Sequence, residues 1–267
     1  MPEQPTNIDK KSIIAVIPAH MLSVRFPGKI LHPFFGHPMI EHVRRRAQLA
    51  SLIDDVYVAT CDQIIADTIR DYGGKVIMTG NHHKNGTTRV AEAVKDMDCS
   101  HVILLQGDEP LLKPDHVDAV ASAIMANPDG DAWNATATLD HLDDMDRHSF
   151  VKCAVGHDGR ILYCFRRCPS HADFTDRQNY IKKIMGIIAY RKDILIKLIS
   201  IPPSFIETIE FIEQMRLLDH GMSMQSVPLD IALPSVNEPN EGDMVIQYLN
   251  NHPDQQALLK QTFGLDI

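Results

Sequence analysis

The sequence predicts an α/β fold in which helices flank a mainly parallel sheet. Apolar, largely β-branched runs at residues 13–17 and 101–105 suit strands that are covered on both faces. Between them, strand-like and helix-like segments alternate, which favours right-handed βαβ connections. Ligands of such folds bind beyond the carboxyl ends of the strands, so the loops after the strands are the places to look for a site.

The elements are predicted in order along the chain. The polar residues 1–11 are expected to form a disordered extension. Pro38 suits the first turn of a helix, and Gly73-Gly74 suits the end of another. We expect strands at 13–17, 55–60, 75–78 and 101–105, and helices at 38–47, 63–72, 90–97 and 115–125.

The second half of the chain departs from this alternation. Strands are expected at 150–155, 160–165 and 184–190, and the turn His157-Asp-Gly159 suits a hairpin between the first two. We therefore expect a β-rich subdomain over about 140–195, inserted into a domain that spans 12–252. A helix is predicted at 206–220. Residues 241–263 predict one or two helices with a break before Pro253, so that 253–267 form a helical tail.

Composition narrows the class of protein. The chain has 267 residues, 44% of them hydrophobic, which is normal for a globular protein. A net charge of −9 argues against nucleic-acid binding, so an anionic ligand must be held by a local cluster of Arg and Lys. Five cysteines without a C-x-x-C pair, and no apolar run near roughly 18 residues, favour a cytoplasmic protein with no membrane span. The pair His82-His83 is interpreted as solvent-facing or capping rather than as metal ligands.

Three loops carry residues suited to phosphate chemistry. The loop from Ala19 to Lys29 contains small residues, the basic residues Arg25 and Lys29, and Pro27-Gly28. It matches neither G-x-x-x-x-G-K-[ST] nor G-x-G-x-x-G. An ordinary basic surface loop is the alternative. The second loop, Asn85-Gly-Thr-Thr-Arg89, leads toward a helix. The third follows the buried strand at 101–105 and contains Asp108, a carboxylate placed where a divalent cation would need an oxygen ligand, unless the segment is only a turn.

The motifs I-P-A, S-x-R-x-P-G-K, G-T-x-R and Q-G-D-E-P, in this order, resemble those of the 3-deoxy-manno-octulosonate (Kdo) cytidylyltransferases. The resemblance covers about residues 12–248. It implies a Rossmann-like nucleotidyltransferase fold and a homodimer. It also implies a reaction in which the anomeric hydroxyl of a sugar acid attacks the α-phosphate of CTP with Mg²⁺, giving CMP-Kdo and pyrophosphate for lipopolysaccharide synthesis.

The resemblance also implies roles for single residues. Catalysis is assigned to Arg25, Lys29 and Asp108. Nucleotide binding is assigned to Ala19, His20, Arg25, Lys29, Gly86, Arg89 and Gln106. Sugar-acid binding is assigned to Gln106, Arg166, Tyr190, Glu213 and Gln214, with Arg166 as the type of residue that clamps a carboxylate. A polar helix face is the alternative for Glu213-Gln214. The metal is assigned to Asp108 and Asn237.

The sequence departs from the family pattern at three positions. His20 replaces an arginine, Ile184 replaces a histidine expected to face the sugar, and Asn237 replaces a metal-binding aspartate. Asparagine offers Mg²⁺ a carbonyl oxygen but no charge, unless Glu238 substitutes. Two further interpretations therefore stay open: CMP transfer to another ulosonic acid or a phosphonate, and a catalytically silent relative that binds a nucleotide or a partner.

Overall fold

A nine-stranded sheet forms the centre of the molecule, in the order β11-β7-β10-β6-β1-β4-β5, with β8 paired to β10 and β9 to β8. The computed structural model describes residues 12–23 and 25–265, so the expected extension at 1–11 lies outside the described residues. The strands are β1 (Ile13–Ala19), β4 (Asp55–Thr60), β5 (Lys75–Met78), β6 (His101–Leu105), β7 (Ala132–Ala137), β8 (Lys152–Val155), β9 (Ile161–Phe165), β10 (Ile181–Arg191) and β11 (Met224–Pro228). Strands β2 (Pro33–Phe34) and β3 (His37–Pro38) form a separate small hairpin.

The sheet is mainly parallel, as predicted. Strand β1 runs parallel to β4 and β6, β4 runs parallel to β5, and β11 runs parallel to β7. Strand β10 is antiparallel to both of its neighbours in the sheet, β6 and β7. The carboxyl ends of β1, β4, β5 and β6 therefore meet at one edge, where the three loops of interest emerge.

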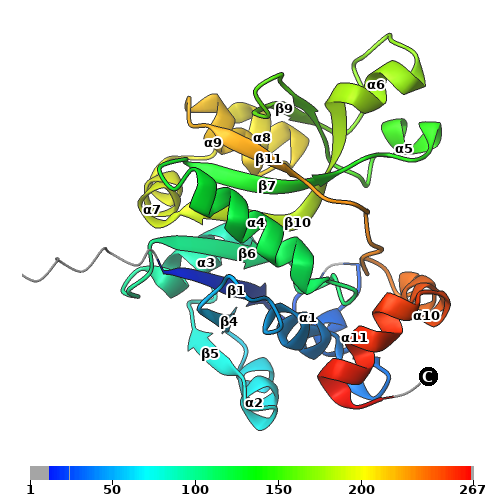
Figure 1. Cartoon of the computed structure of the whole chain (residues 1–267). Helices are drawn as coiled ribbons and strands as arrows, with labels where there is room; N and C mark the ends of the chain where they lie inside the picture. Colours follow the sequence, from blue (N-terminus) through cyan, green and yellow to red (C-terminus); the bar gives the residue numbers. More distant parts are fainter. Residues whose placement is uncertain (1–11, 24, 266–267) are drawn as a thin grey trace, which may run out of the picture.

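Helices cover both faces of the sheet (Figure 1). They are α1 (Met39–Ala47), α2 (Gln63–Asp71), α3 (Gly86–Val94), α4 (Pro114–Ala126), α5 (Leu142–Asp146), α6 (Phe174–Tyr180), α7 (Lys192–Ser200), α8 (Phe205–Glu210), α9 (Gln214–Asp219), α10 (Glu241–Asn251) and α11 (Pro253–Phe263), with the short 3₁₀ helix η1 (Lys29–Leu31). None of those in residues 12–23 and 25–265 is long and apolar enough to cross a membrane.

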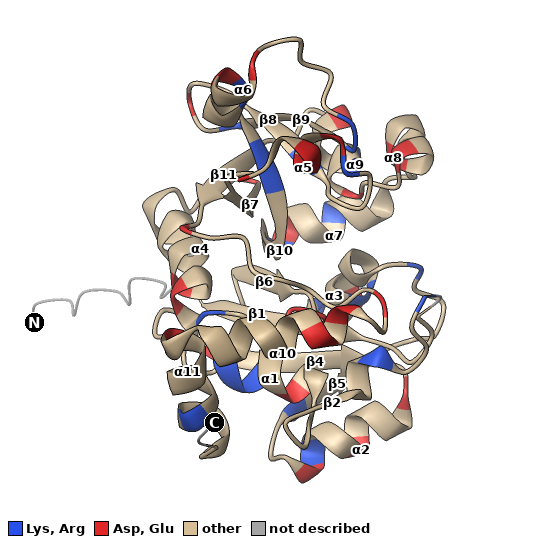
Figure 2. Cartoon of the chain, turned by 90° about the vertical axis from the view of Figure 1, so that its right-hand side faces the viewer, with Lys and Arg blue, Asp and Glu red and all other residues tan. Residues whose placement is uncertain are grey.

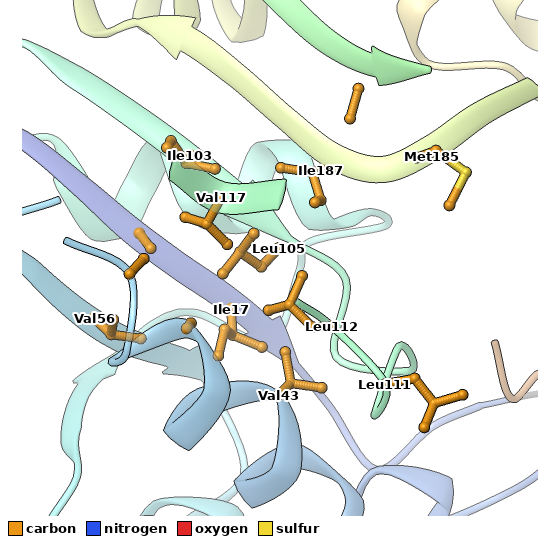
Figure 3. Packing of buried hydrophobic residues seen from close by; sticks show 14 of the residues in the cluster. Ile17, Val43, Val56, Ile103, Leu105, Leu111, Leu112, Val117, Met185 and Ile187 are labelled. Carbon is orange, nitrogen blue, oxygen red and sulfur yellow. The ribbon is translucent and has the colours of Figure 1, made fainter. Parts of the chain in front are cut away.

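Alternate residues of β1 face two hydrophobic cores. Ile17 points toward the core that includes α1, α2 and α4, whereas Val16 points toward the core that includes α3 and α7. Figure 3 shows the first core, with Ile17 of β1 beside Val43 of α1, and with Leu105 and Ile187 on the next two strands across the sheet. A strand covered on both faces explains the continuous apolar run that predicted β1.

Several predicted boundaries are confirmed. Strands β4, β5 and β6 have the predicted bounds. Helix α2 is followed by Gly73, whose φ of +73° is the left-handed conformation that glycine adopts without strain. The break between α10 and α11 falls at His252, directly before Pro253, as predicted.

Two predictions of local structure are wrong, and two strands of the main sheet were missed. The helix expected at 206–220 is two helices, because Phe211 adopts a left-handed conformation that ends α8. The helix expected from Val90 begins at Gly86, because the Asn85 side chain accepts a bond from Thr88 N and caps it there. Strands β7 and β11 were not predicted.

The β-rich region projects from the main sheet. Strands β8 and β9 form the expected hairpin, with Gly159 at a φ of +80° in its turn. The long strand β10 pairs with β8 near its start and with β6 near its end, so one strand belongs to both regions. Figures 1 and 2 both place α5, α6, β9 and α9 at the opposite end from α1 and α2.

Candidate active site

Glycines let two loops approach each other at the ends of β1 and β6. Gly28 has a φ of +73° and begins η1, which places Lys29 at the start of that helix. A Cβ on Gly107 would lie 2.5 Å from Ile30 Cδ1, so a larger residue in the turn after β6 would force the Ile30 side chain to shift. The turn carries Asp108 toward Lys29.

Lys29 and Asp108 form an ion pair at this edge. Lys29 Nζ lies 2.5 Å from Asp108 Oδ2 and also donates to the Val236 carbonyl at 3.1 Å. Val236 N in turn donates to the Asp108 carbonyl at 2.9 Å. Three segments far apart in the sequence therefore meet here, and the last of them leads directly to Asn237.

The residues after Val236 bring Arg25 into the same cluster. Arg25 Nη2 donates to Asn237 Oδ1 at 3.0 Å, and Arg25 Nη1 lies 3.8 Å from Glu238 Oε1. The Arg25 side chain is 55% exposed, so it can turn to a ligand. The backbone N–H groups of Asn237 and Glu238 donate to the carboxylate of Glu241, at 2.5 and 3.1 Å, which fixes the segment before α10.

The oxygens of this cluster suit Mg²⁺. Asp108 offers a carboxylate and Asn237 an amide oxygen, and both now face the cationic side chains of Lys29 and Arg25. Mg²⁺ is commonly bound by one or two carboxylates together with substrate phosphates and water. The donor set fits such an ion beside a triphosphate, with less negative charge from the protein than two aspartates would supply.

His20 adds little positive charge to this edge. Partial desolvation lowers the pKa of His20, and the nearby charges of Arg89 and Lys29 lower it further, while Asp62 opposes them. The ring is therefore mainly neutral near pH 7. The replacement of arginine by His20 leaves Arg25 and Lys29 as the cations best placed for a triphosphate.

Helix α3 begins directly above the end of β1. A Cβ on Gly86 would lie 2.9 Å from Pro18 Cγ, so glycine permits this close packing. Arg89 is buried, and its Nη1 donates to Thr79 Oγ1 at 2.6 Å and to the Gly80 carbonyl at 3.3 Å. Arg89 therefore joins α3 to the loop after β5.

Two residues beside Asp108 contact a bulge in β10 that spans Ile184 to Ile188. Gln106 N donates to the Gly186 carbonyl at 2.9 Å, and Glu109 Oε1 accepts from Gly186 N at 3.0 Å. Burial, and secondarily the charge of Asp108, raise the pKa of Glu109 to about 7. Glu109 was missed as a candidate from the sequence, although it stands within the Q-G-D-E-P motif.

Asn134 of β7 was also missed. Its Nδ2 donates to the Met185 carbonyl at 3.0 Å, and its Oδ1 accepts from Gln214 Nε2 at 3.1 Å. Gln214 is therefore connected through Asn134 to the same bulge that Glu109 holds from the other side. Only the polar interruption of an otherwise apolar strand marks Asn134 in the sequence.

The residues assigned to the sugar acid make mostly internal contacts. Arg166 donates from Nε, Nη1 and Nη2 to the carbonyls of Glu210, His148 and Phe211, at 2.9, 3.0 and 3.0 Å. Its guanidinium thus holds the segment between α8 and α9, and its role as a carboxylate clamp stays a prediction. Tyr190 is 1% exposed and lies in the core, so the structure does not place it on a surface that a substrate reaches.

Glu213 connects the segment before α9 to helix α3. Its Oε2 accepts from Thr87 Oγ1 at 2.6 Å, and burial raises the pKa of its carboxyl despite that bond. It precedes α9 rather than lying within a longer polar helix face. Glu213 also lines a cavity of about 1240 Å³ between α3 and the α7–α8 segment.

Sequence comparisons identify relatives along most of the chain. A family model described as cytidylyltransferase matches residues 14–224. The 3-deoxy-manno-octulosonate cytidylyltransferase of Geobacter metallireducens is 33% identical over 250 residues, which is 89% of this chain and 98% of the relative. An 8-amino-3,8-dideoxy-manno-octulosonate cytidylyltransferase of Shewanella frigidimarina is 35% identical over 235 residues, which is 86% of this chain and 95% of that relative.

Solved structures show the same fold. A structure of CMP:2-keto-3-deoxy-manno-octonic acid synthetase complexed with CTP matches with a TM-score of 0.84 and 31% identity, covering 90% of this chain and 99% of that one. A cytidylyltransferase from Leptospira borgpetersenii matches with a TM-score of 0.62 over 94% of both chains. At 15% identity, that second match shows the fold alone.

Proposed function

Because this chain belongs to the cytidylyltransferase family, we propose that it transfers CMP from CTP to the anomeric hydroxyl of Kdo. The products are CMP-Kdo, an activated sugar for lipopolysaccharide synthesis, and pyrophosphate. The observation that carries the proposal is the meeting of Lys29, Asp108 and the Arg25–Asn237 pair at the carboxyl edge of the sheet. Relatives of nearly full length carry the same activity in their names.

The reaction needs charge neutralisation and positioning. The anomeric hydroxyl oxygen forms a bond to the α-phosphorus and gives up its proton to water, as the bond from that phosphorus to the bridging oxygen of pyrophosphate breaks. Negative charge grows on the leaving group, and fixed cations stabilise it most in the transition state. Lys29 and Arg25 are paired with oxygens that a triphosphate can replace, so both can turn to phosphate without breaking the fold.

We assign Mg²⁺ to Asp108 and Asn237. Bound Mg²⁺ supplies positive charge to the triphosphate and restrains its geometry. Asp108 would hold it through the carboxylate, and Asn237 through the amide oxygen that now accepts from Arg25. Glu238 is exposed and close to Arg25, so it is the residue placed to add the charge that Asn237 lacks.

We place the sugar acid between the nucleotide edge and the β10 bulge. Gln106 approaches this region from one side, where its backbone N–H donates to the Gly186 carbonyl and its side chain lies beside Gly186. Gln214 approaches it from the other side through its hydrogen bond to Asn134. Arg166 supports the site by holding the α8–α9 segment in place. Tyr190 supports it by packing in the core that includes Ile212 and Met215. Ala19, His20, Gly86 and Arg89 form the wall on the nucleotide side.

A second acceptor is the 8-amino analogue of Kdo. The observation that favours it is the 35% identity to the Shewanella frigidimarina enzyme, which is named for that acid. The two acids share their ring and carboxylate, so the same CTP site would serve either one. Ile184, which replaces a polar residue of the family pattern, stands at the start of the bulge and is consistent with an altered acceptor.

We also propose a homodimer in the cytoplasm. The projecting region exposes a group of large apolar side chains, Leu162, Tyr163, Phe205, Ile209 and Phe211. A second copy of the chain would cover them, since exposed apolar clusters commonly mark interfaces. All five cysteines are free thiols, which suits a reducing compartment where CTP is made. Light scattering on purified protein measures the oligomeric state.

The function is tested with purified enzyme, CTP and Mg²⁺. Pyrophosphate release is measured with Kdo, with 8-amino-Kdo and without an acceptor. We expect pyrophosphate and a CMP-sugar, identified by mass spectrometry, only when an acceptor is present. A higher kcat/KM with the amino sugar would establish the second acceptor instead. CTP binding without turnover on either acid would favour the silent relative, or an enzyme for another acid. Asp108→Ala serves as the inactive control.

A further inference from the structure

A group of two histidines and one glutamate lies outside the site described above. His82 and His83 stand in the loop after β5, and Glu92 stands on α3. His83 is 6% exposed in its side chain, and its Nε2 is hydrogen-bonded to Glu92 Oε2. His82 Nε2 lies 3.8 Å from the same oxygen. One ligand atom from each of the three residues lies within 4.8 Å of the other two.

We propose that His82, His83 and Glu92 bind a divalent transition-metal ion of the zinc class. Imidazole nitrogen with a carboxylate oxygen is a donor set for Zn²⁺, Co²⁺ or Ni²⁺, whereas Mg²⁺ prefers oxygens alone. Three protein ligands leave a further position for water or an anion. This proposal differs from the interpretation of the histidine pair as solvent-facing or capping.

The geometry needs two small adjustments. Ligands of a tetrahedral zinc ion stand about 3.3 Å apart, given metal–nitrogen distances of roughly 2.0–2.1 Å. The hydrogen-bonded pair of His83 Nε2 and Glu92 Oε2 must open to that spacing as the ion replaces the shared proton. His82 must move closer, and its side chain is 73% exposed and free to turn. The rings of His82 and His83 already lie with their centroids 4.2 Å apart.

A backbone hydrogen bond fixes the direction of the Glu92 carboxylate. Its Oε1 accepts from Gly80 N at 2.9 Å, which leaves Oε2 directed at the two histidines. A Cβ on Gly80 would lie 2.5 Å from the His82 ring, so glycine at this position lets the ring approach. Backbone support of a ligand carboxylate fixes its direction, as such outer contacts do in metal sites.

The three proposed ligands line a cavity that is open to solvent, and an ion bound there would also connect two elements of the fold. All three side chains line the cavity of about 1240 Å³, so solvent reaches the position that the protein leaves open. The cavity also carries Lys84 and Lys95, which lower the affinity for a cation but suit an anion as the further ligand. Because Gly80 and Thr79 also accept from Arg89, an ion here would clamp the loop after β5 to α3.

The test uses full-length protein without a histidine tag, stripped of metal and free of CTP. Titration with Co²⁺ should give one bound ion with the visible absorption of a low-coordinate site. His82→Ala should weaken binding at least tenfold and remove that absorption, and its exposed position protects the fold. His157→Ala, an exposed histidine on the β8–β9 turn, is the matched control and should bind as wild type does.

Two further measurements keep the result unambiguous. Asp108→Asn removes the carboxylate at the nucleotide edge and should leave the Co²⁺ spectrum unchanged. Glu92→Gln keeps the side-chain shape and should weaken binding, because the amide has no charge. Equal affinity in wild type and His82→Ala, or no binding at micromolar Co²⁺ or Zn²⁺, would overturn the proposal. Neither result depends on whether the enzyme transfers CMP.

Discussion

Two regions of the molecule use the same residue types in opposite ways. The nucleotide edge consists of the loops after β1 and β6, and the acceptor region consists of the β10 bulge and the α8–α9 segment. At the nucleotide edge, Lys29 and Arg25 pair with a carboxylate and an amide oxygen that solvent can reach. In the acceptor region, all the guanidinium nitrogens of Arg166 donate to backbone carbonyls. Lys29 also donates to the Val236 carbonyl, but its carboxylate partner is one that a triphosphate can replace. The three partners of Arg166 are all backbone carbonyls that hold the fold. The partner, more than the residue type, decides whether a cation is available to a substrate.

The largest expected effect is a loss of catalytic rate when a cation of the nucleotide edge is removed. Lys29→Met should lower kcat/KM by about 10²–10³-fold, since it removes a charge that acts on the leaving phosphates. Some loss of melting temperature is also expected, because the Lys29 and Asp108 side chains are only 16% and 21% exposed and the variant leaves Asp108 without its cation. Pyrophosphate release and a thermal melt measure both quantities. Lys75→Met breaks another Lys–Asp pair, with Asp55, and should leave the rate unchanged.

In the acceptor region, removal of Arg166 is expected to lower stability more than it lowers the rate. Arg166→Ala removes three hydrogen bonds to backbone carbonyls and should lower the free energy of unfolding by about 2–3 kcal/mol. Urea denaturation gives that value. If the variant were as stable as wild type but had lost kcat/KM for the acceptor alone, Arg166 would be a substrate ligand, and the distinction between the two regions would fail at this residue.

A smaller effect, confined to part of the pH range, is expected where the regions meet. Burial raises the pKa of Glu213 above its ordinary 4.5, so the folded protein holds this proton more tightly than the unfolded chain. The contribution of Glu213 to stability is therefore complete below about pH 4.5 and is lost as the pH rises through the raised pKa. Urea denaturation of wild type and Glu213→Gln across this range should give a difference that changes in this direction. A constant difference would contradict the buried, protonated carboxyl.

The smallest effect sharpens the description of the metal site. Asn237→Asp adds a charge beside Asp108 and should lower the Mg²⁺ concentration for half-maximal rate by about tenfold, which corresponds to roughly 1.4 kcal/mol of added binding. Magnesium titrations of the initial rate measure it. If Glu238→Gln instead raises the Mg²⁺ requirement and Asn237→Asp changes nothing, Glu238 already supplies the missing charge.

The sequence predicted the nucleotide half of the fold better than the acceptor half. Strands β4, β5 and β6 are short apolar runs bounded by turn residues, and such local signals are readable from the chain alone. Strand β7 contains Asn134, whose polar side chain is satisfied by the β10 bulge and by Gln214. That satisfaction depends on contacts more than 50 residues away, so no local pattern reveals it.

The same difference applies to the site residues. The approach of Arg25, Lys29 and Asp108 was predictable because parallel strands bring their following loops to one edge. The internal role of Arg166 was not, because it depends on where Phe211 ends α8 and turns its carbonyl. The pairing of His83 with Glu92 likewise arises only when the loop after β5 folds back onto α3.

The thermal shift produced by CTP and Mg²⁺ tests the distinction between the two regions most directly. It is measured in wild type, Lys29→Met and Arg166→Ala, each relative to its own melting temperature without ligand. We predict that CTP stabilises Arg166→Ala as much as wild type, because its nucleotide edge is intact, and stabilises Lys29→Met far less. An unchanged shift in Lys29→Met, or a lost shift in Arg166→Ala, would contradict the assignment of CTP to the edge formed by β1 and β6.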